Sequence, residues 1–236
     1  MSVPFFFSEN ISSENTPVIL DEESSRHIVQ VLRMKTGEKI LLTDGKGHSA
    51  NGEIAEAHKK HCAVNAISSS FVQRRTPVLT VAISLIKNTA RFEWFLEKAT
   101  ELGAGEIIPL ICERTEKQHA RRDRMAGICK SAMLQSTQVW MPVVHEPKAF
   151  KEVAGSALQQ QKLFGHITGR ARSLSSAIDP SFNSHIILIG PEGDFSEEEI
   201  ALAKSLHFEG VSLGNTILRV ETAGIYAAVI HAAARV

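Results

Sequence analysis

Two glycine-containing segments near the end of the chain hold the residues best suited to bind a small ligand. The first, Gly190-Pro191-Glu192-Gly193-Asp194-Phe195-Ser196, follows the apolar run from Ile186 to Ile189, and the second runs from Leu213 to Ala223. A short continuous run of β-branched residues and leucine is typical of a buried parallel strand, and ligands of open α/β sheets lie at the carboxyl ends of such strands. The first segment alone also fits an ordinary tight turn. The second segment favours a binding site, to which we expect both to contribute.

The residue types of the first segment indicate which ligands such a site accepts. Gly190 and Gly193 let the backbone approach a ligand without a Cβ atom in the way. Ser196 and Glu199 form the pattern of a capping box, which predicts that a helix starts here. Acidic side chains crowd the same stretch: Glu192, Asp194, Glu197, Glu198 and Glu199. A phosphate would meet like charge there, and neither Gly-x-Gly-x-x-Gly nor Gly-x-x-x-x-Gly-Lys-Ser/Thr occurs in the chain, so we expect a neutral or cationic ligand.

These segments resemble the carboxyl-terminal signature of the RsmE family, the 16S ribosomal RNA uracil-N3 methyltransferases of the SPOUT class. The matching residues are Gly-Pro-Glu-Gly-Asp-Phe-Ser-x-x-Glu from Gly190 and Leu-Gly-x-x-Ile-Leu-Arg-x-Glu-Thr-Ala from Leu213. Two upstream segments are similar to other motifs of the family: His27-x3-Val31-Leu32-Arg33-x3-Gly37, and Lys87-x3-Arg91-x-Glu93 followed by Lys98-Ala99-Thr100-Glu101-Leu102-Gly103. The resemblance spans essentially the whole chain.

The resemblance implies a fold, a cofactor and partners. The fold is α/β, a SPOUT-type parallel sheet with a carboxyl-terminal trefoil knot, preceded by a PUA-like RNA-binding β-barrel. S-adenosylmethionine is the implied cofactor, bound in knot loops at 164–167, 190–194 and 213–219, and no metal ion is expected. The residues implied to bind it are Gly165, His166, Gly190, Pro191, Glu192, Gly193, Leu213, Gly214, Ile217, Leu218 and Arg219. The implied partners are a second copy of the chain and 16S ribosomal RNA, within the small ribosomal subunit.

The implied reaction needs more than placement of the methyl group, because uracil N3 carries a proton. S-adenosylmethionine suits an acidic loop, since it has no phosphate and its sulfonium is cationic. The sulfonium already activates the methyl group, so the protein still has to promote loss of the N3 proton. Either a base accepts this proton or a cation stabilises the uracil anion that its loss creates. Arg219 and Glu221 are the catalytic candidates, with Arg219 stabilising the uracil anion or orienting a phosphate. Alternatively, the two residues form a structural ion pair.

Basic residues are concentrated in two stretches, although the formal net charge is zero. Between Glu56 and Glu93 there is no carboxylate, and this window holds Lys59, Lys60, Arg74, Arg75, Lys87 and Arg91. The second stretch holds Arg114, Lys117, Arg121, Arg122, Arg124 and Lys130. Each residue taken singly fits a solvated surface, whereas two clusters beside one expected cleft favour contact with RNA phosphates. With the resemblance, the expected RNA-binding residues are Arg26, Arg33, Lys87, Arg91 and Gln138.

Two positions depart from the family pattern. Many members carry arginine where this chain has Phe5 and Gln138, so two expected RNA contacts are lost, although the amide of Gln138 still offers hydrogen bonds to a base or phosphate. A catalytically silent RNA-binding or ribosome-assembly factor is the alternative function, and the intact loop motifs argue against it. A Rossmann-type nucleotide enzyme is disfavoured because the phosphate fingerprint is missing.

Length and composition fit a globular protein of one large or two smaller domains. With 236 residues, of which 43% are hydrophobic and 22% charged, the chain can bury a sizeable core. Apolar runs are all shorter than the roughly 18 residues of a membrane span, and no basic region opens the chain, so secretion is not expected. The cysteines Cys62, Cys112 and Cys129 are widely spaced and indicate neither a disulfide framework nor a zinc site. We expect a cytoplasmic protein.

The polar run Ser68-Ser69-Ser70 and Pro77 mark a boundary. Residues 1–72, the expected PUA-like domain, show strand patterns at 39–43, 48–57 and 62–67 and a helix pattern at 22–34. Residues 73–236, the expected methyltransferase domain, alternate strand and helix patterns, which favours a parallel sheet. Strands are expected there at 78–86, 106–111, 163–167, 186–189 and 210–213, and helices at 92–102, 121–140 and 222–234. The last helix is apolar on nearly every side, so we expect it to be buried in a core or against a second subunit.

Overall fold

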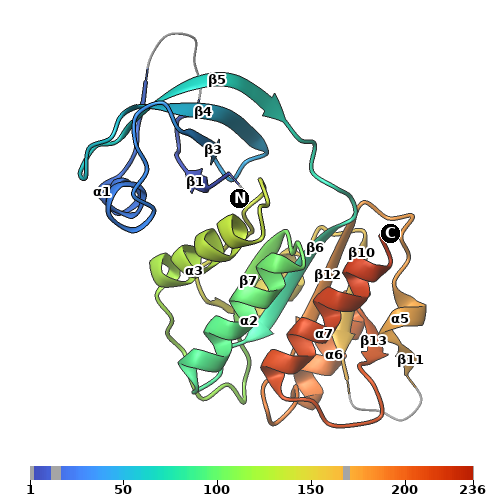
Figure 1. Cartoon of the computed structure of the whole chain (residues 1–236). Coiled ribbons are helices and arrows are strands. Elements are labelled where there is room, and N and C mark those ends of the chain that lie inside the picture. Colours follow the sequence, from blue (N-terminus) through green and yellow to red (C-terminus); the bar gives the residue numbers. More distant parts are fainter. Residues whose placement is uncertain (1–2, 12–16, 167–170, 236) are drawn as a thin grey trace. The chain divides into compact units, whose positions relative to one another are not determined.

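A computed structural model describes residues 3–11, 17–166 and 171–235 of the chain (Figure 1). The chain divides into two compact units. The first combines residues 1–74 with 133–141, and the second combines residues 75–132 with 142–236. Over the described ranges, none of the helices has both the length and the apolar character needed to cross a membrane.

A five-stranded sheet forms the first unit. Its strand order is β1-β3-β4-β5-β2, with β1 parallel to β3 and the other pairs antiparallel. The strands are β1 (Phe5–Phe7), β2 (Val18–Ile19), β3 (Lys39–Thr43), β4 (His48–Glu56) and β5 (Ala63–Phe71). Side chains of a strand alternate between the two faces of a sheet, and the inward residues of β3 and β4 form the core of this unit: Ile40, Leu42, Ala50 and Ile54.

The helix expected at residues 22–34 is shorter and ends in a wider turn. α1 (Glu22–Arg26) continues as the π-helical turn η1 (His27–Val31). Hydrogen bonds from residue i to i+5 widen such a turn and rotate the residues that follow it. As a result Ile28 is fully buried, whereas Val31 and Leu32, which the sequence pattern places on the same face, are 65% and 40% exposed.

One helix, whose residues belong to both units, ends earlier than its sequence pattern predicts. α3 spans Arg122–Gln135 rather than reaching residue 140, because Thr137 adopts a left-handed φ of 54° that an α-helix does not contain. Residues 133–141 belong to the first unit, to which the sequence analysis does not assign them. Within that unit the indole N–H of Trp140 donates to the carbonyl oxygen of Val72 at 2.9 Å. Thr137 thus ends the helix locally, and contacts with residues far upstream hold the segment that follows.

A parallel eight-stranded sheet forms the frame of the second unit (Figure 1). Its order is β11-β13-β10-β12-β6-β7-β8, with β9 beside β7, and each of these pairs is parallel. The strands are β6 (Val78–Ser84), β7 (Glu106–Ile111), β8 (Val143–Val144), β9 (Lys148–Ala149), β10 (Gln161–Gly165), β11 (Arg172–Ser173), β12 (Ser184–Ile189) and β13 (Glu209–Ser212). This confirms the parallel α/β sheet predicted from the alternating patterns.

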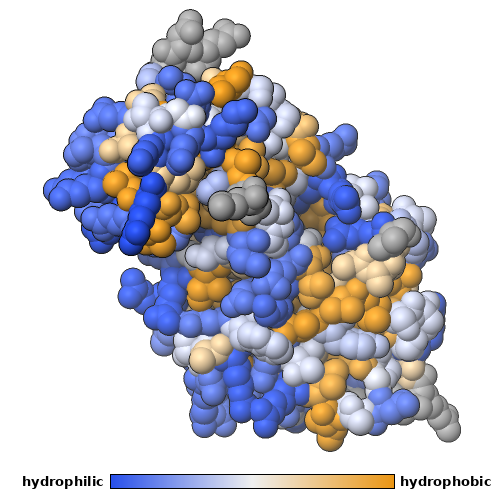
Figure 2. Space-filling model, viewed as in Figure 1, coloured by the Kyte–Doolittle hydropathy of each residue, from blue (hydrophilic) through white to orange (hydrophobic). Residues whose placement is uncertain are grey.

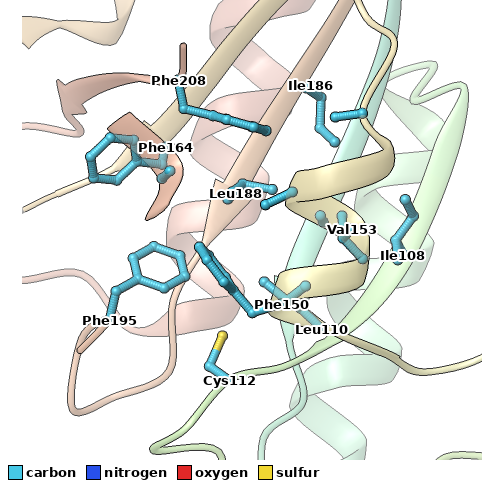
Figure 3. Packing of buried hydrophobic residues seen from close by; sticks show 14 residues of the cluster. Ile108, Leu110, Cys112, Phe150, Val153, Phe164, Ile186, Leu188, Phe195 and Phe208 are labelled. Atoms are coloured by element: carbon cyan, nitrogen blue, oxygen red, sulfur yellow. The ribbon is translucent and has the colours of Figure 1, made fainter. Parts of the chain in front are cut away.

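Helices pack on both faces of this sheet. They are α2 (Thr89–Glu101), α4 (Phe150–Ser156), α5 (Leu174–Ala177), α6 (Glu197–Ser205) and α7 (Val220–Ala233). On one face, the rings of Phe150 and Phe195 lie 5.3 Å apart near Cys112, in a cluster with residues of β12 (Figure 3). On the other face, α7 lies against α2 and β6. A Cβ atom at Gly224 would come within 2.6 Å of Phe95 and 2.7 Å of Ile83, so the missing side chain lets α7 approach closely.

Candidate functional site

A pocket opens at the carboxyl ends of three neighbouring strands of the second unit, β10, β12 and β13. It encloses about 100 Å³ and continues into space open to solvent. Most residues expected to bind the cofactor line it: Gly165, His166, Gly190, Pro191, Glu192, Leu213, Gly214, Ile217 and Leu218. Residue 167, included in the first expected loop, lies outside the described residues.

Gly193 and Arg219, also expected at the cofactor, are not among the lining residues. The carbonyl oxygen of Gly193 accepts a hydrogen bond from Nη1 of Arg114 at 2.6 Å, so Gly193 takes part in holding the loop. Arg219 is the N-cap residue of α7, and its side chain is exposed. The structure thus places both residues next to the pocket in sequence but not in its wall.

Two glycines shape the pocket for different reasons. A Cβ atom at Gly165 would lie 3.0 Å from Cδ1 of Leu213, so there is little room for a side chain between these two loops. Gly214 has open space around its Cα, but its φ of 127° lies in the region that residues with a side chain rarely adopt. The path of the third loop therefore depends on glycine at position 214.

His166 and Asp194 give the pocket a polar wall. Nδ1 of His166 lies 3.3 Å from Oδ2 of Asp194, close enough for an ion pair but without the alignment of a hydrogen bond. Oδ1 of Asp194 accepts the backbone N–H of Phe195 at 2.8 Å, which holds the carboxylate in place. The buried Nδ1 of His166 therefore faces Asp194 without a hydrogen bond to any residue in the described part of the chain.

The capping box predicted at the start of α6 is confirmed, and it does more than begin a helix. Oγ of Ser196 accepts the backbone N–H of Glu199 at 3.3 Å, and Oε2 of Glu199 accepts that of Ser196 at 3.0 Å. Oε1 of Glu199 accepts the backbone N–H of Glu113 at 2.9 Å. One buried carboxylate thus ties the loop after β12 to the loop after β7.

The two catalytic candidates differ in their surroundings. Glu221 lies in the first turn of α7, its side chain is only 7% exposed, and its Oε1 lies 3.7 Å from Nε of Arg91 in an ion pair. Arg219 is exposed and forms no ion pair with any residue that the structure describes. Over this part of the chain, the charged partner of Glu221 is therefore Arg91 and not Arg219.

Lys87 and Arg91, both expected to bind RNA, lie in the same unit as the pocket. Arg91 keeps about half of its side chain exposed while it pairs with Glu221. Lys87, near the end of β6, pairs with Glu116, and this contact raises the pKa of Lys87 above its ordinary value. Both cations thus already have carboxylate partners, so an RNA phosphate would join or displace an existing ion pair.

The other residues expected to bind RNA belong to the first unit. Arg26 is exposed and its Nη2 lies 2.7 Å from Oε1 of Glu22, one helical turn away. Arg33 is exposed at a positive φ of 55°, just after η1. The side-chain amide of Gln138 donates to Oγ of Ser136 at 3.0 Å. The structure groups Arg26 and Arg33 around one helical segment and places Gln138 on the segment 133–141.

The pocket also contains six residues that the sequence analysis does not name individually as cofactor-binding: Ile189, Asp194, Ser212, Thr216, Val220 and Ala223. Asp194 and Thr216 fall within the expected loops 190–194 and 213–219, whereas Ile189 and Ser212 lie outside both glycine-containing segments. Ile189 and Ser212 are the last residues of β12 and β13. The rule that ligands lie at the carboxyl ends of parallel strands would have found these two. Val220 and Ala223 belong to the first turn of α7, and their place in the wall follows only from how that helix packs.

Comparison with known proteins gives the family. Residues 74–232 match the RNA methyltransferase domain, and residues 20–67 match the RNA methyltransferase PUA domain. Ribosomal RNA small subunit methyltransferase E of Bacillus subtilis is 29% identical over 220 residues, covering 87% of this chain and 85% of that protein. The protein of the same name from Synechocystis is 30% identical over 213 residues, covering 87% of this chain and 69% of its own length.

A solved structure supports the same relationship. Ribosomal RNA small subunit methyltransferase E from Neisseria gonorrhoeae, bound to S-adenosyl methionine, superposes with a TM-score of 0.86 at 30% identity, over 97% of this chain and 96% of that one. The fold and site define a two-unit protein with a PUA-type sheet unit and a parallel α/β unit that holds a ligand pocket at its strand ends. The chain belongs to the family of RNA methyltransferases that includes the small subunit methyltransferases E. The family that the sequence motifs resemble is thereby confirmed.

Proposed function

We propose that this protein uses S-adenosylmethionine to methylate N3 of a specific uridine in the 16S ribosomal RNA of the small subunit. The composition of the pocket wall supports the cofactor, and the similarity to ribosomal RNA small subunit methyltransferases E supports the substrate. The described residues of the wall include the carboxylates of Glu192 and Asp194 and contain no lysine or arginine. Such a wall disfavours a phosphate and favours a ligand that is cationic at this contact. S-adenosylmethionine has this chemistry, and when bound it supplies an activated methyl group.

The pocket residues fit this cofactor. The loops at Gly165, Gly190 and Gly214 bring backbone N–H and C=O groups to the wall, which suits recognition of an adenine edge. Apolar side chains such as Ile189 and Leu218 offer surface for the ring. The ring of His166 forms part of the same wall. Gly193 and Arg219 support the site from outside its wall. Among the described residues, no group of three or more histidine, cysteine or acidic side chains could hold a metal ion.

The chain itself has to position the uracil and to handle its N3 proton. Arg219 lies between the lining residues Leu218 and Val220 and is exposed, which supports its assignment to the stabilisation of the uracil anion. Glu221 is buried against Arg91. We assign to Glu221 the positioning of Arg91 toward the RNA, with direct acceptance of the N3 proton as its alternative role.

RNA binding is assigned to both units. Lys87 and Arg91 contact phosphates near the pocket, and Arg26, Arg33 and Gln138 contact RNA from the PUA-type unit. Phosphate contacts supply affinity and orientation and leave the choice of base to the site itself. The domains proposed for these two tasks are residues 1–72 and 73–236.

The protein acts as a homodimer in the cytoplasm, with 16S ribosomal RNA of the small ribosomal subunit as its partner. Support for the dimer comes from α2 and α7, which contact each other and expose Trp94 by 48% and Val229 by 43%. Figure 2 shows apolar patches over the part of the second unit that α7 occupies in Figure 1. Cys62, Cys112 and Cys129 are free and buried, as suits a reducing compartment. The trefoil knot implied by the sequence resemblance stays a prediction.

Mass spectrometry of 16S ribosomal RNA from cells with and without the protein tests the proposed reaction. One uridine should lose an N3 methyl group when the protein is absent and regain it when purified protein and S-adenosylmethionine are added. Calorimetry with S-adenosylhomocysteine should show binding that a chelator does not change. Binding of RNA without any binding of either cofactor form would favour a catalytically silent assembly factor. Light scattering at micromolar concentration tests the dimer, and a monomer there would contradict it.

A further inference from the structure

A second cavity lies in the same unit, beside the cofactor pocket. It measures about 520 Å³ and lies where β6 and β7 end, between the start of α2, the segment 117–121 and the first turn of α3. β6 pairs with β12, whose end forms part of the cofactor pocket, so the two cavities are neighbours along one edge of the sheet. Their described linings share no residue. This cavity is therefore a separate site within reach of the first.

The cavity has an apolar floor and a cationic rim. Leu85, Phe92 and Met125 form the floor and are nearly buried, with exposed fractions of 2%, 4% and 4%. The charged lining consists of three cations against one carboxylate: Lys117, Arg121, Arg124 and Glu93. An apolar slot edged by positive charge matches a ligand that combines a flat, poorly hydrated ring with a phosphate.

The cations of the rim have different tasks. Arg124 is held by Glu93 through two hydrogen bonds, from Nε at 2.5 Å and from Nη2 at 3.0 Å, so this pair forms a neutral, fixed wall. Nζ of Lys117 donates to Oγ1 of Thr89 at 2.7 Å, which places its ammonium at the edge of the cavity. Arg121 is exposed and forms no ion pair with a described residue. Lys117 and Arg121 are thus the cations open to an anion.

One loop connects the two cavities. Glu113 and Arg114 bond to Glu199 and Gly193, which hold the loop of the cofactor pocket. A few residues later, the same loop supplies Lys117 and the segment up to Arg121 to the second cavity. A ligand in the second cavity therefore lies against a segment that is anchored to the cofactor loop.

We propose that this second cavity binds an unpaired nucleotide of the RNA substrate that flanks the target uridine, with its base on the apolar floor and its phosphate on Lys117 and Arg121. The nucleotide is unpaired because a base within an A-form duplex does not present its ring face to a protein. The inference rests on the proposed function, since it takes the occupant to be part of the methylated RNA. The proposal adds a subsite, so the enzyme binds a nucleotide next to the target uridine as well as the uridine itself.

Binding of a 16S ribosomal RNA transcript made in vitro, measured over a range of KCl concentrations, tests the subsite. Arg121→Ala should weaken binding and reduce the slope of log K against log salt by about 0.7, the value for one single-stranded phosphate contact. Arg121→Lys keeps the charge and should keep the slope. Thr89→Trp fills the cavity from its rim and also removes the hydroxyl that holds Lys117, and it should raise Kd about tenfold. Thr89→Ala removes the hydroxyl without filling the cavity and should raise Kd less, so the difference between the two variants measures exclusion of the base. Lys151→Ala, an exposed lysine of α4 outside both linings, is the matched control and should bind as the wild type does.

The outcomes separate this inference from the proposed function. All variants should bind S-adenosylhomocysteine with wild-type affinity, which shows that they are folded. If Arg121→Ala and Thr89→Trp bind RNA as tightly as Lys151→Ala while the wild type methylates the transcript, the subsite is wrong and the proposed function stands. An equal loss of slope in Arg121→Lys would overturn the phosphate contact. If the wild type methylates neither the transcript nor small ribosomal subunits from cells that lack the protein, but both variants lose RNA affinity, the RNA subsite stands and the proposed reaction is wrong.

Discussion

Arg91 on α2 and Glu221 on α7 form an ion pair in which Nε and Oε1 lie 3.7 Å apart, in the first turns of their two helices. The carboxylate is buried, whereas almost half of the Arg91 side chain is exposed. Glu221 can therefore hold one side of the guanidinium while its remaining N–H groups face solvent or RNA. A residue expected to serve the chemistry and a residue expected to bind RNA are thus physically coupled.

This coupling predicts that changes at the two positions are not additive. Glu221→Gln should weaken RNA binding nearly as much as Arg91→Ala, because it releases the arginine from its fixed orientation. The double variant should be little worse than either single one, with an interaction energy of about 0.5 to 3 kcal/mol in a double-mutant cycle on RNA affinity. A Glu221→Gln enzyme that binds RNA normally but loses single-turnover methylation would instead identify Glu221 as the proton acceptor.

Arg219→Ala should separate chemistry from cofactor binding. Its side chain does not line the pocket, so affinity for S-adenosylmethionine should stay close to that of the wild type. Single-turnover methylation at saturating RNA should fall on the order of a hundredfold or more, as for the loss of one contact made mainly in the transition state. Rapid-quench assays at saturating RNA measure this rate. Methylation at the wild-type rate would exclude Arg219 from the chemical step.

Gly214→Val should abolish cofactor binding without unfolding the protein. The φ of 127° at this position is unfavourable for a β-branched residue, so the third loop must change its path. Gly155→Val is a control for the side chain itself, because the structure leaves open space around Gly155 in α4, away from the pocket lining. Calorimetry with S-adenosylhomocysteine and a thermal melt distinguish lost binding from lost folding. Normal affinity in folded Gly214→Val would remove this loop from the site.

Gly224→Ala should destabilise the protein although alanine is the better helix former. The propensity gain is about 1 kcal/mol, but the new Cβ would meet Phe95 and Ile83 at less than 3 Å and overpack the contact of α7, at about 1 to 3 kcal/mol. Gly127→Ala in α3 is the matched control, since nothing lies within 4 Å of its added Cβ. Urea unfolding should show reduced stability for the first variant and equal or increased stability for the second. Equal gains in both would mean that α7 does not approach its neighbours this closely.

The burial of His231 predicts that the protein loses stability in acid. His231 is 1% exposed in α7, its ring lies 5.1 Å from that of His185, and burial, together with Arg235 and His185, lowers its pKa to about 3. The unfolded chain takes up this proton near pH 6.5, whereas the folded protein resists it. Above pH 6.5 His231 is neutral in both states, so the free energy of unfolding keeps its full value. As the pH falls from 6.5 toward 3, the unfolded chain binds a proton that the folded protein does not, and the free energy of unfolding decreases by up to about 1.4 kcal/mol per pH unit.

Urea unfolding of the wild type and His231→Phe at pH 7.5, 6 and 5 measures this effect. The variant should lose less stability on acidification, because one titrating group has been removed while His185, whose pKa burial also lowers, is still present. His207→Asn, at an exposed histidine after α6 whose left-handed φ of 65° asparagine tolerates, serves as the control and should follow the wild type. Parallel pH profiles for the wild type and His231→Phe would show that His231 is not kept neutral by the fold.

The local sequence was sufficient to predict structural features in which the interacting residues lie only a few positions apart. The capping box of Ser196 and Glu199 is confirmed because both hydrogen bonds close within one helical turn. The continuous apolar runs predicted the buried strands β6, β7 and β12, since a parallel strand covered on both faces is apolar throughout. The glycine segments after β12 and β13 pointed to the pocket, because ligands of such sheets lie at the carboxyl ends of the strands.

Tertiary structure alone decided the features that join distant parts of the chain. Glu199 bonds to Glu113 across 86 residues and Arg114 to Gly193 across 79, and no local pattern records either contact. The ion pair of Arg91 and Glu221 depends on α2 packing against α7. The membership of residues 133–141 in the first unit likewise depends on hydrogen bonds to residues far upstream, namely Gly45, Gly47 and Val72. Periodicity fixes which face of an element is apolar, whereas only the packed chain fixes which charged groups meet across it.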